Sequence, residues 1–296
     1  MCRLIGYSKQ AYYQQISYQE QKAFDEYLIV ELINRKRTIW KKGSGRNLFA
    51  ALADDFKHHG IEIGRDKFFE ILRRQGLLVI RKSNKAITTM SYHHYHKYPN
   101  LIMDVKVLGS NQVWVSDITY IWLTEPNCFA YLSLITDLYS HRIMGYCLLA
   151  TLRTEGPLEA LRMAIKYAGT ANVKGCIHHS DRGVQYCCND YVAELKRSKI
   201  EISMTQSGNP LENAVAERVN GIIKYEFSDD KQIKFSDIET GKKQIKQFID
   251  FYNDERPHSS IERLTPTEAY KMEGQLKRCW KNYYKVKQIE NVITEQ

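Results

Sequence analysis

The stretch QVWVSDITYIWL, residues 112–123, alternates β-branched and aromatic side chains in the way that predicts a β-strand. Asp117 stands in the middle of this stretch. A carboxylate inside an apolar strand is costly unless it is paired, so this position calls for a cation. The stretch therefore predicts both a buried strand and one residue of a functional site.

The sequence that follows continues the sheet. Residues 129–140 and 142–150 predict two more strands, joined by a short turn at Ser140-His141. Helices and strands then alternate: helix 154–169, strand 173–183, helix 188–200, strand 201–207, and helices 212–227 and 240–255. Three antiparallel strands followed by this alternation are typical of a mixed α/β layer.

The composition is that of a soluble globular protein large enough for two domains. The chain has 296 residues, of which 43% are hydrophobic and 26% are charged. It contains no run of 18 apolar residues and does not open with a secretory signal, which predicts a cytoplasmic protein with no membrane partner. The seven cysteines contain no CxxC pair and favour reduced thiols over a disulfide scaffold.

The formal charge of +9 is confined to the first third of the chain. Residues 1–100 carry 18 Lys and Arg against 9 Asp and Glu, whereas the other 196 residues carry 25 of each kind. A basic segment joined to a neutral one is typical of a polyanion-binding module beside a second activity. A solvated basic surface would have the same composition.

The basic third predicts helices. Apolar residues recur at helical spacing in 17–36, 45–60 and 65–76, and a tight turn at 61–64 joins the last two segments. Two short helices joined in this way form the helix-turn-helix pattern. Its second helix would present four basic residues to DNA: Arg65, Lys67, Arg73 and Arg74. The alternative is an ordinary small helical bundle with a solvated basic face.

The stretch CIHHSDRGVQY, residues 176–186, gathers polar groups at the end of the fourth predicted strand. A hydrolase triad would need Ser180 on a G-x-S-x-G turn, which the sequence does not have. A zinc site is disfavoured because the adjacent His178 and His179 point to opposite faces of a strand. The third interpretation takes Asp181 as a carboxylate that awaits a metal and further ligands.

Two carboxylates besides Asp117 suit that interpretation. Asp181 ends the fourth strand, and Glu217 lies in the predicted helix 212–227 with 35 residues between them. Three carboxylates from separate elements, if they meet at one end of a sheet, can hold divalent ions such as Mg²⁺ through oxygen ligands. Two such ions can clamp an in-line phosphoryl displacement. Each acid by itself could equally be a separate surface or salt-bridged group.

Four motifs in this order resemble a known family. VWVSDITYI, HHSDRGVQY, the D-35-E spacing with ENAVAERVNGIIKYEF, and FIDFYNDERPHSSIERLTPTEAY are similar to the integrase-core transposases of bacterial insertion sequences. The resemblance covers nearly the whole chain and is most specific to the second reading-frame product (OrfB) of the insertion-sequence-three family. It implies an α/β, RNase H-like catalytic core, a mixed five-stranded sheet with helices, after a small all-α helix-turn-helix region. The expected divisions are a DNA-binding region at 1–82, a linker at 83–108, the core at 109–272 and a tail at 273–296.

The resemblance also implies roles for individual residues. Asp117, Asp181 and Glu217 match the family's catalytic, metal-binding acids, with Mg²⁺ as the cofactor, two ions, and Mn²⁺ as a substitute. Lys224, two helical turns after Glu217, matches a basic residue that binds DNA at the active site. Three further residues would shape the metal or DNA pocket: His179, Gln185 and Asn213. The ERPH segment around Arg256 would support the fold and the DNA path, and the loop 206–210 would cover the site.

The implied function is that of a DNA transposase. Water activated by the metal would cut at the 3′ end of the element, and the freed 3′-hydroxyl would attack a second phosphodiester. The implied partners are DNA, the first-frame product (OrfA) of the same element, and further copies of this chain on paired ends. Two other functions remain open: a non-catalytic DNA-binding regulator of transposition, and a metal-dependent nuclease of the same fold.

Overall fold

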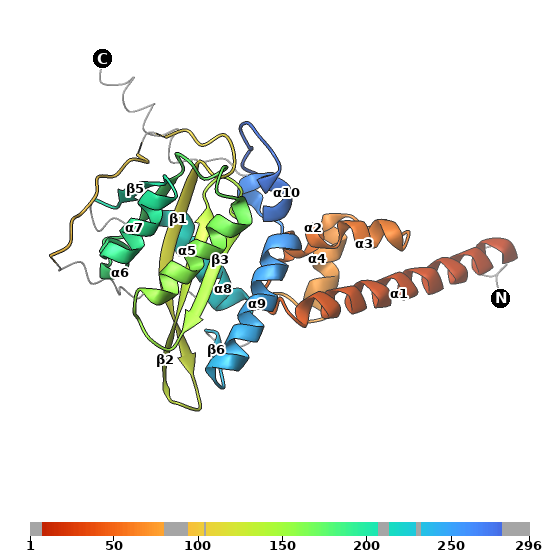
Figure 1. The fold of residues 1–296 in the computed structure, drawn as a ribbon. Helices are drawn as coiled ribbons and strands as arrows, with labels where there is room; N and C mark the ends of the chain where they lie inside the picture. Colours follow the sequence, from red (N-terminus) through yellow and green to blue (C-terminus); the bar gives the residue numbers. More distant parts are fainter. Residues whose placement is uncertain (1–7, 80–93, 104, 207–212, 229–231, 280–296) are drawn as a thin grey trace, which may run out of the picture. The chain divides into compact units, whose positions relative to one another are not determined.

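The computed structural model describes residues 8–79, 94–103, 105–206, 213–228 and 232–279 (Figure 1). All but the first residue of the loop expected at 206–210 lies outside these ranges, as do parts of the expected linker and tail. The chain separates into two compact units, residues 1–82 and 83–296, and each is described by itself. No helix in the described ranges is long and apolar enough to cross a membrane.

The first unit is helical. Its elements are α1 (Lys9–Arg37), α2 (Gly45–Ala51), α3 (Ala53–His58) and α4 (Arg65–Arg74). Ser8 caps α1 by accepting a hydrogen bond from the Ala11 amide at 3.1 Å. Buried apolar side chains hold the four helices together, among them Ile33, Leu48, Phe56 and Phe68.

The helix expected over 45–60 is bent. Leu52, with φ −99° and ψ 1°, leaves the helical conformation and separates α2 from α3. The Leu52 amide still donates to Leu48 O, and the Phe56 amide donates to Leu52 O, so hydrogen bonding continues across the bend. Gly60 then takes a positive φ of 65°, which suits glycine, and the chain turns into α4.

The second unit is built on a mixed sheet whose strands lie in the order β3-β2-β1-β4-β5. Strands β1 (Val113–Leu123), β2 (Cys128–Asp137) and β3 (Ile143–Leu149) are antiparallel neighbours. Strands β4 (Ile177–Ser180) and β5 (Glu201–Met204) extend the sheet, with β4 parallel to β1 and β5 parallel to β4. The predicted fold class is therefore confirmed.

One strand was not expected. β6 (Lys234–Phe235) pairs in parallel with the far end of β1, so the sheet has six strands rather than five. A strand of two residues is too short to show an alternating pattern in the sequence, and only its pairing with Trp122 and Leu123 identifies it.

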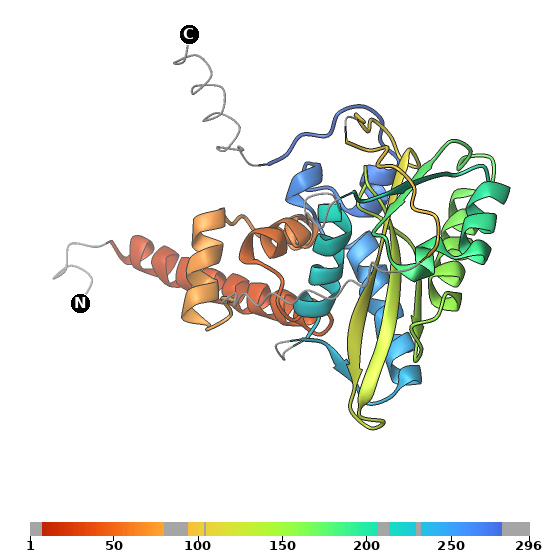
Figure 2. The same cartoon turned by 90° about the vertical axis from the view of Figure 1, so that its left-hand side faces the viewer.

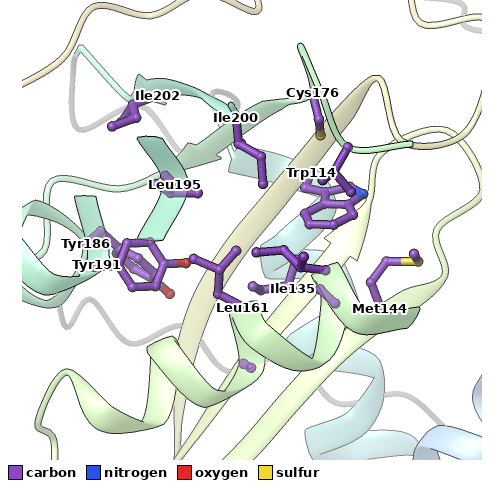
Figure 3. Close-up of a cluster of buried hydrophobic side chains, with 14 of the residues drawn as sticks. Trp114, Ile135, Met144, Leu161, Cys176, Tyr186, Tyr191, Leu195, Ile200 and Ile202 are labelled. Carbon is purple, nitrogen blue, oxygen red and sulfur yellow. The ribbon is translucent and has the colours of Figure 1, made fainter. Parts of the chain in front are cut away.

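Helices cover both faces of this sheet (Figure 2). One face carries α5 (Glu155–Ala168), α6 (Val184–Cys187) and α7 (Asn189–Arg197), and the other carries α8 (Ala214–Glu226) and α9 (Ile238–Asp254). A 3₁₀-helix, η3 (Ser259–Ile261), and α10 (Pro266–Tyr270) follow. The core beneath α5 and α7 includes Trp114, Leu161 and Tyr191, all fully buried (Figure 3).

Helix α5 lies unusually close to β3. A Cβ atom added to Gly145 would lie 2.0 Å from the Ala160 carbonyl oxygen and 2.9 Å from the Ala164 amide nitrogen. Both contacts are to helix backbone, which cannot rotate away as a side chain can. The absence of a side chain at residue 145 is therefore what allows the helix to pack on the strand.

The ERPH segment anchors α8 to the loop that follows α9. Arg256 is 2% exposed and donates to both carboxylate oxygens of Glu226, at 3.0 and 3.1 Å. Its remaining terminal nitrogen lies 2.9 Å from His258 Nε2, and burial together with the Arg256 charge holds the pKa of His258 well below its usual range. Neutral His258 can accept this hydrogen bond, so the buried guanidinium has a partner on each side.

Replacing Gly145 by alanine should destabilise the second unit. The new methyl group would push α5 away from β3, and overpacking of this kind costs roughly 1–3 kcal/mol. Urea unfolding of the G145A chain, followed by circular dichroism, measures the loss. Gly221→Ala is the matched control, because nothing lies within 4 Å of a Cβ added there inside α8. G221A should be neutral or slightly stabilising, and equal stability of G145A and wild type would contradict the packing described.

Candidate active site

Strand β1 places Asp117 on the face of the sheet that α8 covers. Its neighbour across the antiparallel pair is Leu134 of β2. One carboxylate oxygen accepts the Ile118 amide at 2.9 Å, and the other accepts Asn220 Nδ2 of α8 at 2.7 Å. The carboxylate is thus held between its own strand and the helix above it.

Asp181 follows directly after β4. Because β4 is parallel to β1, with His179 opposite Val115, the chain beyond Ser180 emerges beside the middle of β1. Asp181 is half-buried, and its Oδ1 accepts the Gly183 amide at 2.9 Å. A Cβ on Gly183 would lie 2.9 Å from that oxygen, so a side chain at this position would require the Asp181 carboxylate to shift.

Helix α8 carries the third acid and the basic residue. Glu217 lies in the first turn of α8, where the helix dipole favours a negative charge. Lys224 lies in the last turn and is half-buried. The two residues are seven positions apart, about two turns, and so share one side of the helix.

The charges of these residues influence one another. Burial raises the pKa of Asp117 to about 7, and the nearby Asp181 and Glu217 carboxylates add to the rise, against the hydrogen bonds from Asn220 and Ile118. Desolvation also raises the pKa of Glu217, although the residue as a whole is exposed. Burial lowers the pKa of Lys224, and the Asp117 charge counteracts this. The three acids and Lys224 therefore belong to one electrostatic environment.

The acids do not form a closed ligand set in this conformation. Across the described part of the chain, no three His, Cys, Asp or Glu side chains are arranged so that they could hold one metal ion. Burial raises the pKa of Asp117, and the negative charges of Asp181 and Glu217 raise it further, so the carboxylates repel one another in this arrangement.

The three residues expected to shape the pocket each link two elements. His179 Nδ1 lies 2.8 Å from Ser203 Oγ of β5. Gln185 donates to the Leu152 carbonyl at 3.0 Å, and Asn213 donates to the Ser116 carbonyl at 3.0 Å. Asn213 thereby holds the start of α8 against the residue that precedes Asp117. The hydrogen bonds of the other two brace the neighbouring strand and loop.

The two adjacent histidines point to opposite sides of β4, as predicted. His178 is buried on the other face, where Ser116 Oγ and Tyr191 OH lie 2.6 and 2.9 Å from its Nε2. Burial, together with the nearby His179, lowers the pKa of His178 to about 3, so the ring is neutral. Ser180 Oγ donates to the Asp181 carbonyl at 3.0 Å. None of these contacts is that of a zinc site or a nucleophilic serine.

Asn220 is a residue of the site that the motifs did not identify. It is 5% exposed and contacts Asp117 directly. The signal for it was present in the sequence, since Asn220 lies three positions after Glu217 and four before Lys224 and therefore shares their side of the helix. A polar residue among the buried Val219, Ile222 and Ile223 needs a partner, and the partner is the catalytic candidate.

Apart from Lys224 on α8, the candidate DNA-binding residues lie on α4 of the first unit. Arg65 and Lys67 pair with Asp66 and Glu70 at 3.1 and 2.8 Å, and Arg74 pairs with Glu26 of α1. Arg73 is exposed in the last turn. The solvent-accessible ion pairs of this helix are weak and can exchange for other anions.

Comparison with known proteins places the chain in a family. Residues 108–210 and 198–266 match two integrase core domain families. The chain is 31% identical over 271 residues to the 31 kDa protein of insertion element IS600 from Shigella sonnei, covering 90% of this chain and 96% of that protein. It is also 31% identical over 222 residues to transposase InsF of insertion sequence IS3A from Escherichia coli K12, covering 73% and 74%.

Among solved structures, the HTLV-2 integrase catalytic core in complex with magnesium aligns with 56% of this chain and 99% of its own length, at 14% identity and a TM-score of 0.42. The relationship to the insertion-element proteins is carried by sequence over nearly the full length of the chain. The chain belongs to the family of bacterial insertion-sequence transposases with an integrase core, which are polynucleotidyl transferases of the DDE type.

Proposed function

We propose that this transposase cleaves the 3′ ends of its element and joins them to target DNA through Asp117, Asp181 and Glu217, with divalent metal ions as cofactor. The observation that carries the proposal is the grouping of three carboxylates around a buried strand position: burial of Asp117, together with the Asp181 and Glu217 charges, raises its pKa to about 7. Three acids from a strand, a strand end and a helix are held where they repel one another. A cation bound among them would relieve that repulsion.

The donor set fits a hard cation. All three side chains offer carboxylate oxygens, which Mg²⁺ and Mn²⁺ prefer, and neutral His178 lies on the other side of the sheet. Two such ions, when bound, polarise the phosphate and activate the attacking oxygen of an in-line displacement. Because the set is open in the free protein, we propose that the acids draw together when the ions bind.

The chain's own residues position the reacting groups. Asp117 is fixed on the rigid centre of the sheet, whereas Asp181 and Glu217 approach it from a strand end and a helix. Lys224, at the other end of α8, would bind a DNA phosphate beside the acids. Water attacks the first phosphodiester and releases a 3′-hydroxyl, which attacks the second and releases another. No covalent link to the protein forms, so no serine or tyrosine nucleophile is required.

DNA binding would rest on the first unit and on assembly. We propose that α4 contacts DNA through Arg65, Lys67, Arg73 and Arg74, whose ion pairs are exposed and readily exchanged. We further propose that residues 1–82 act as the DNA-binding region, 83–108 as the linker, 109–272 as the catalytic core and 273–296 as the tail. Element ends would be bound together with the first-frame product and further copies of this chain.

Replacing Asp181 by asparagine should abolish strand joining. The amide keeps the size of the side chain and removes the charge that a cation needs, so DNA binding should be retained. The measurement is joining of labelled element-end DNA with Mg²⁺ or Mn²⁺, with the first-frame product added. Asp250→Asn, an exposed carboxylate on α9 paired with Lys246, is the control and should remain active. Cleavage without joined product would indicate a nuclease, and DNA binding without cleavage by the wild type would indicate a regulator.

The pH dependence of stability should reveal the strained carboxylate. The folded-state pKa of Asp117, about 7, lies above its ordinary 3.8, so its contribution to stability is complete below about pH 4 and is lost as the pH rises through 7. In metal-free buffer at pH 8, Asp117→Asn should therefore be more stable than wild type, by on the order of 1–3 kcal/mol. The difference should disappear near pH 4. Thermal unfolding across this pH range measures it.

Asp237, a carboxylate whose pKa is shifted in the opposite direction, serves as the control for the pH experiment. Asp237 caps α9 by accepting from the Glu239 and Thr240 amides, and its hydrogen bonds, chiefly from Ser236 and Thr240, hold its pKa far below the ordinary value. Its contribution is present above about pH 4 and is lost as the pH falls. Asp237→Asn should therefore be destabilised at pH 8. A D117N chain no more stable than wild type at pH 8 would show that Asp117 is not strained.

Replacing Arg73 and Arg74 together by glutamine should weaken DNA binding without changing chemistry at saturating DNA. Loss of two phosphate contacts should lower the slope of log K against log salt by about 2. Fluorescence anisotropy with labelled duplex at several salt concentrations measures the slope. The control removes two exposed lysines of α9, Lys242→Gln with Lys246→Gln, and should leave the slope unchanged. An unchanged slope in the arginine variant would exclude α4 from the DNA contact.

A further inference from the structure

We infer that Asn220 is the positioning residue that sets the Asp117 carboxylate for cation binding, and that it does so as a neutral donor. The inference rests on the proposed function, in which Asp117 binds the metal. It concerns a residue outside the three acids and assigns it a separate task, the orientation of one acid and of the helix that carries another.

The geometry holds the carboxylate from both sides. Asn220 Nδ2 donates to Asp117 Oδ2 at 2.7 Å, and the Ile118 amide donates to Oδ1 at 2.9 Å. The distance from Asn220 is in the short range of hydrogen bonds to a charged acceptor. With one donor on each oxygen the carboxylate cannot rotate freely, and each oxygen keeps a lone pair for a further partner.

The orientation of the amide follows from its surroundings. Asn220 is 5% exposed, and its Oδ1 accepts no hydrogen bond from the described part of the chain. The reversed amide would place its oxygen against a carboxylate oxygen, with two acceptors and no proton between them. The amino group must therefore face Asp117, which leaves the buried carbonyl oxygen without a hydrogen bond from the described residues, an unfavourable arrangement. The fold therefore keeps the hydrogen bond from Asn220 to Asp117 although the Asn220 carbonyl oxygen is left without a hydrogen bond from the described residues.

The residue type suits this task. Lysine or arginine at 220 would hold the carboxylate but would also neutralise it and compete with a cation. Aspartate would repel it, and an apolar residue would not hold it. An asparagine fixes the direction of the carboxylate and leaves its charge for the metal.

The same hydrogen bond also fixes α8. Asn213 and Asn220 are seven positions apart on one side of this segment, and they donate to consecutive residues of β1, the Ser116 carbonyl and the Asp117 carboxylate. Glu217 lies between them in sequence. The two asparagines therefore hold the helix turn that carries Glu217 against the strand that carries Asp117.

The test measures metal binding by the full chain. Thermal unfolding is followed at increasing Mn²⁺ concentration, since an ion that binds only the folded state raises the melting temperature. For Asn220→Ala, the Mn²⁺ concentration at half of the full shift should rise 10–100-fold, in line with the loss of a residue that orients a metal ligand. Strand joining should be lost at low Mn²⁺ and partly restored at high Mn²⁺, while DNA affinity stays unchanged. Asn220→Leu is similar in size to wild type but has no donor, so it should show the same rise in the half-saturating Mn²⁺ concentration. This variant separates loss of the hydrogen bond from the effect of a cavity.

Asn253 provides the matched control. It is also 5% exposed, and it exchanges two hydrogen bonds with the Ile143 backbone, at 3.0 and 3.1 Å. Asn253→Ala should lower the melting temperature and leave the half-saturating Mn²⁺ concentration unchanged. The inference is overturned if both Asn220 variants bind Mn²⁺ as wild type does. If wild type itself shows no Mn²⁺-dependent shift, the proposed metal site falls and this inference falls with it.

Discussion

The carboxylate of Asp117 in the central strand is the constraint on which the site depends. A second buried carboxylate in the same sheet shows what a purely structural acid looks like. Asp137, at the end of β2, accepts hydrogen bonds from the Ser140 amide, the Ser140 hydroxyl and the Asn111 amide, at 2.6–2.8 Å. Burial raises its pKa too, but its close neighbours are donors. Asp117 accepts two hydrogen bonds and lies near two further carboxylates, whose charges add to the effect of burial on its pKa. Lys224 is near enough to interact with the Asp117 charge, but it is a single cation beside three acids.

Asp117 lies on a rigid central strand, whereas Asp181 and Glu217 lie on elements that can adjust slightly. Strand β1 is central, with β2 on one side and β4 on the other, and cannot shift without breaking both ladders. Helix α8 lies on its face and is fixed at its first residues by Asn213, near its middle by Asn220, and at its end by the Glu226–Arg256 pair. A helix held at three points can tilt only slightly. The proposed closing of the ligand set therefore calls for small adjustments of Asp181 and Glu217 toward Asp117 rather than a large rearrangement.

The sequence predicted those parts that local patterns encode. Strand β1, which carries Asp117, and helices α5, α7, α8 and α9 lie close to their predicted ranges. In these elements the periodicity of the apolar residues agrees with their burial. The bend at Leu52 and the strand at Lys234 depend on tertiary packing and leave no periodic trace. Asn220 falls between these cases. Its side of the helix could be predicted from Glu217, but that this side meets the carboxylate of Asp117 is known only once α8 is placed over β1.

The charge distribution fits a division of tasks between the two units in the proposed function. The last 196 residues carry equal numbers of basic and acidic side chains, and the three acids of the proposed active site would repel the DNA backbone. The proposed metal ions would offset this repulsion locally, yet such ions bind weakly unless phosphate oxygens complete their coordination. Affinity for DNA must therefore come from elsewhere, and the excess of basic residues in the first 100 is the available source. In the proposed function, long-range attraction by the basic unit would bring DNA to the protein, and the acidic site, with its ions, would act only where the DNA backbone is already held.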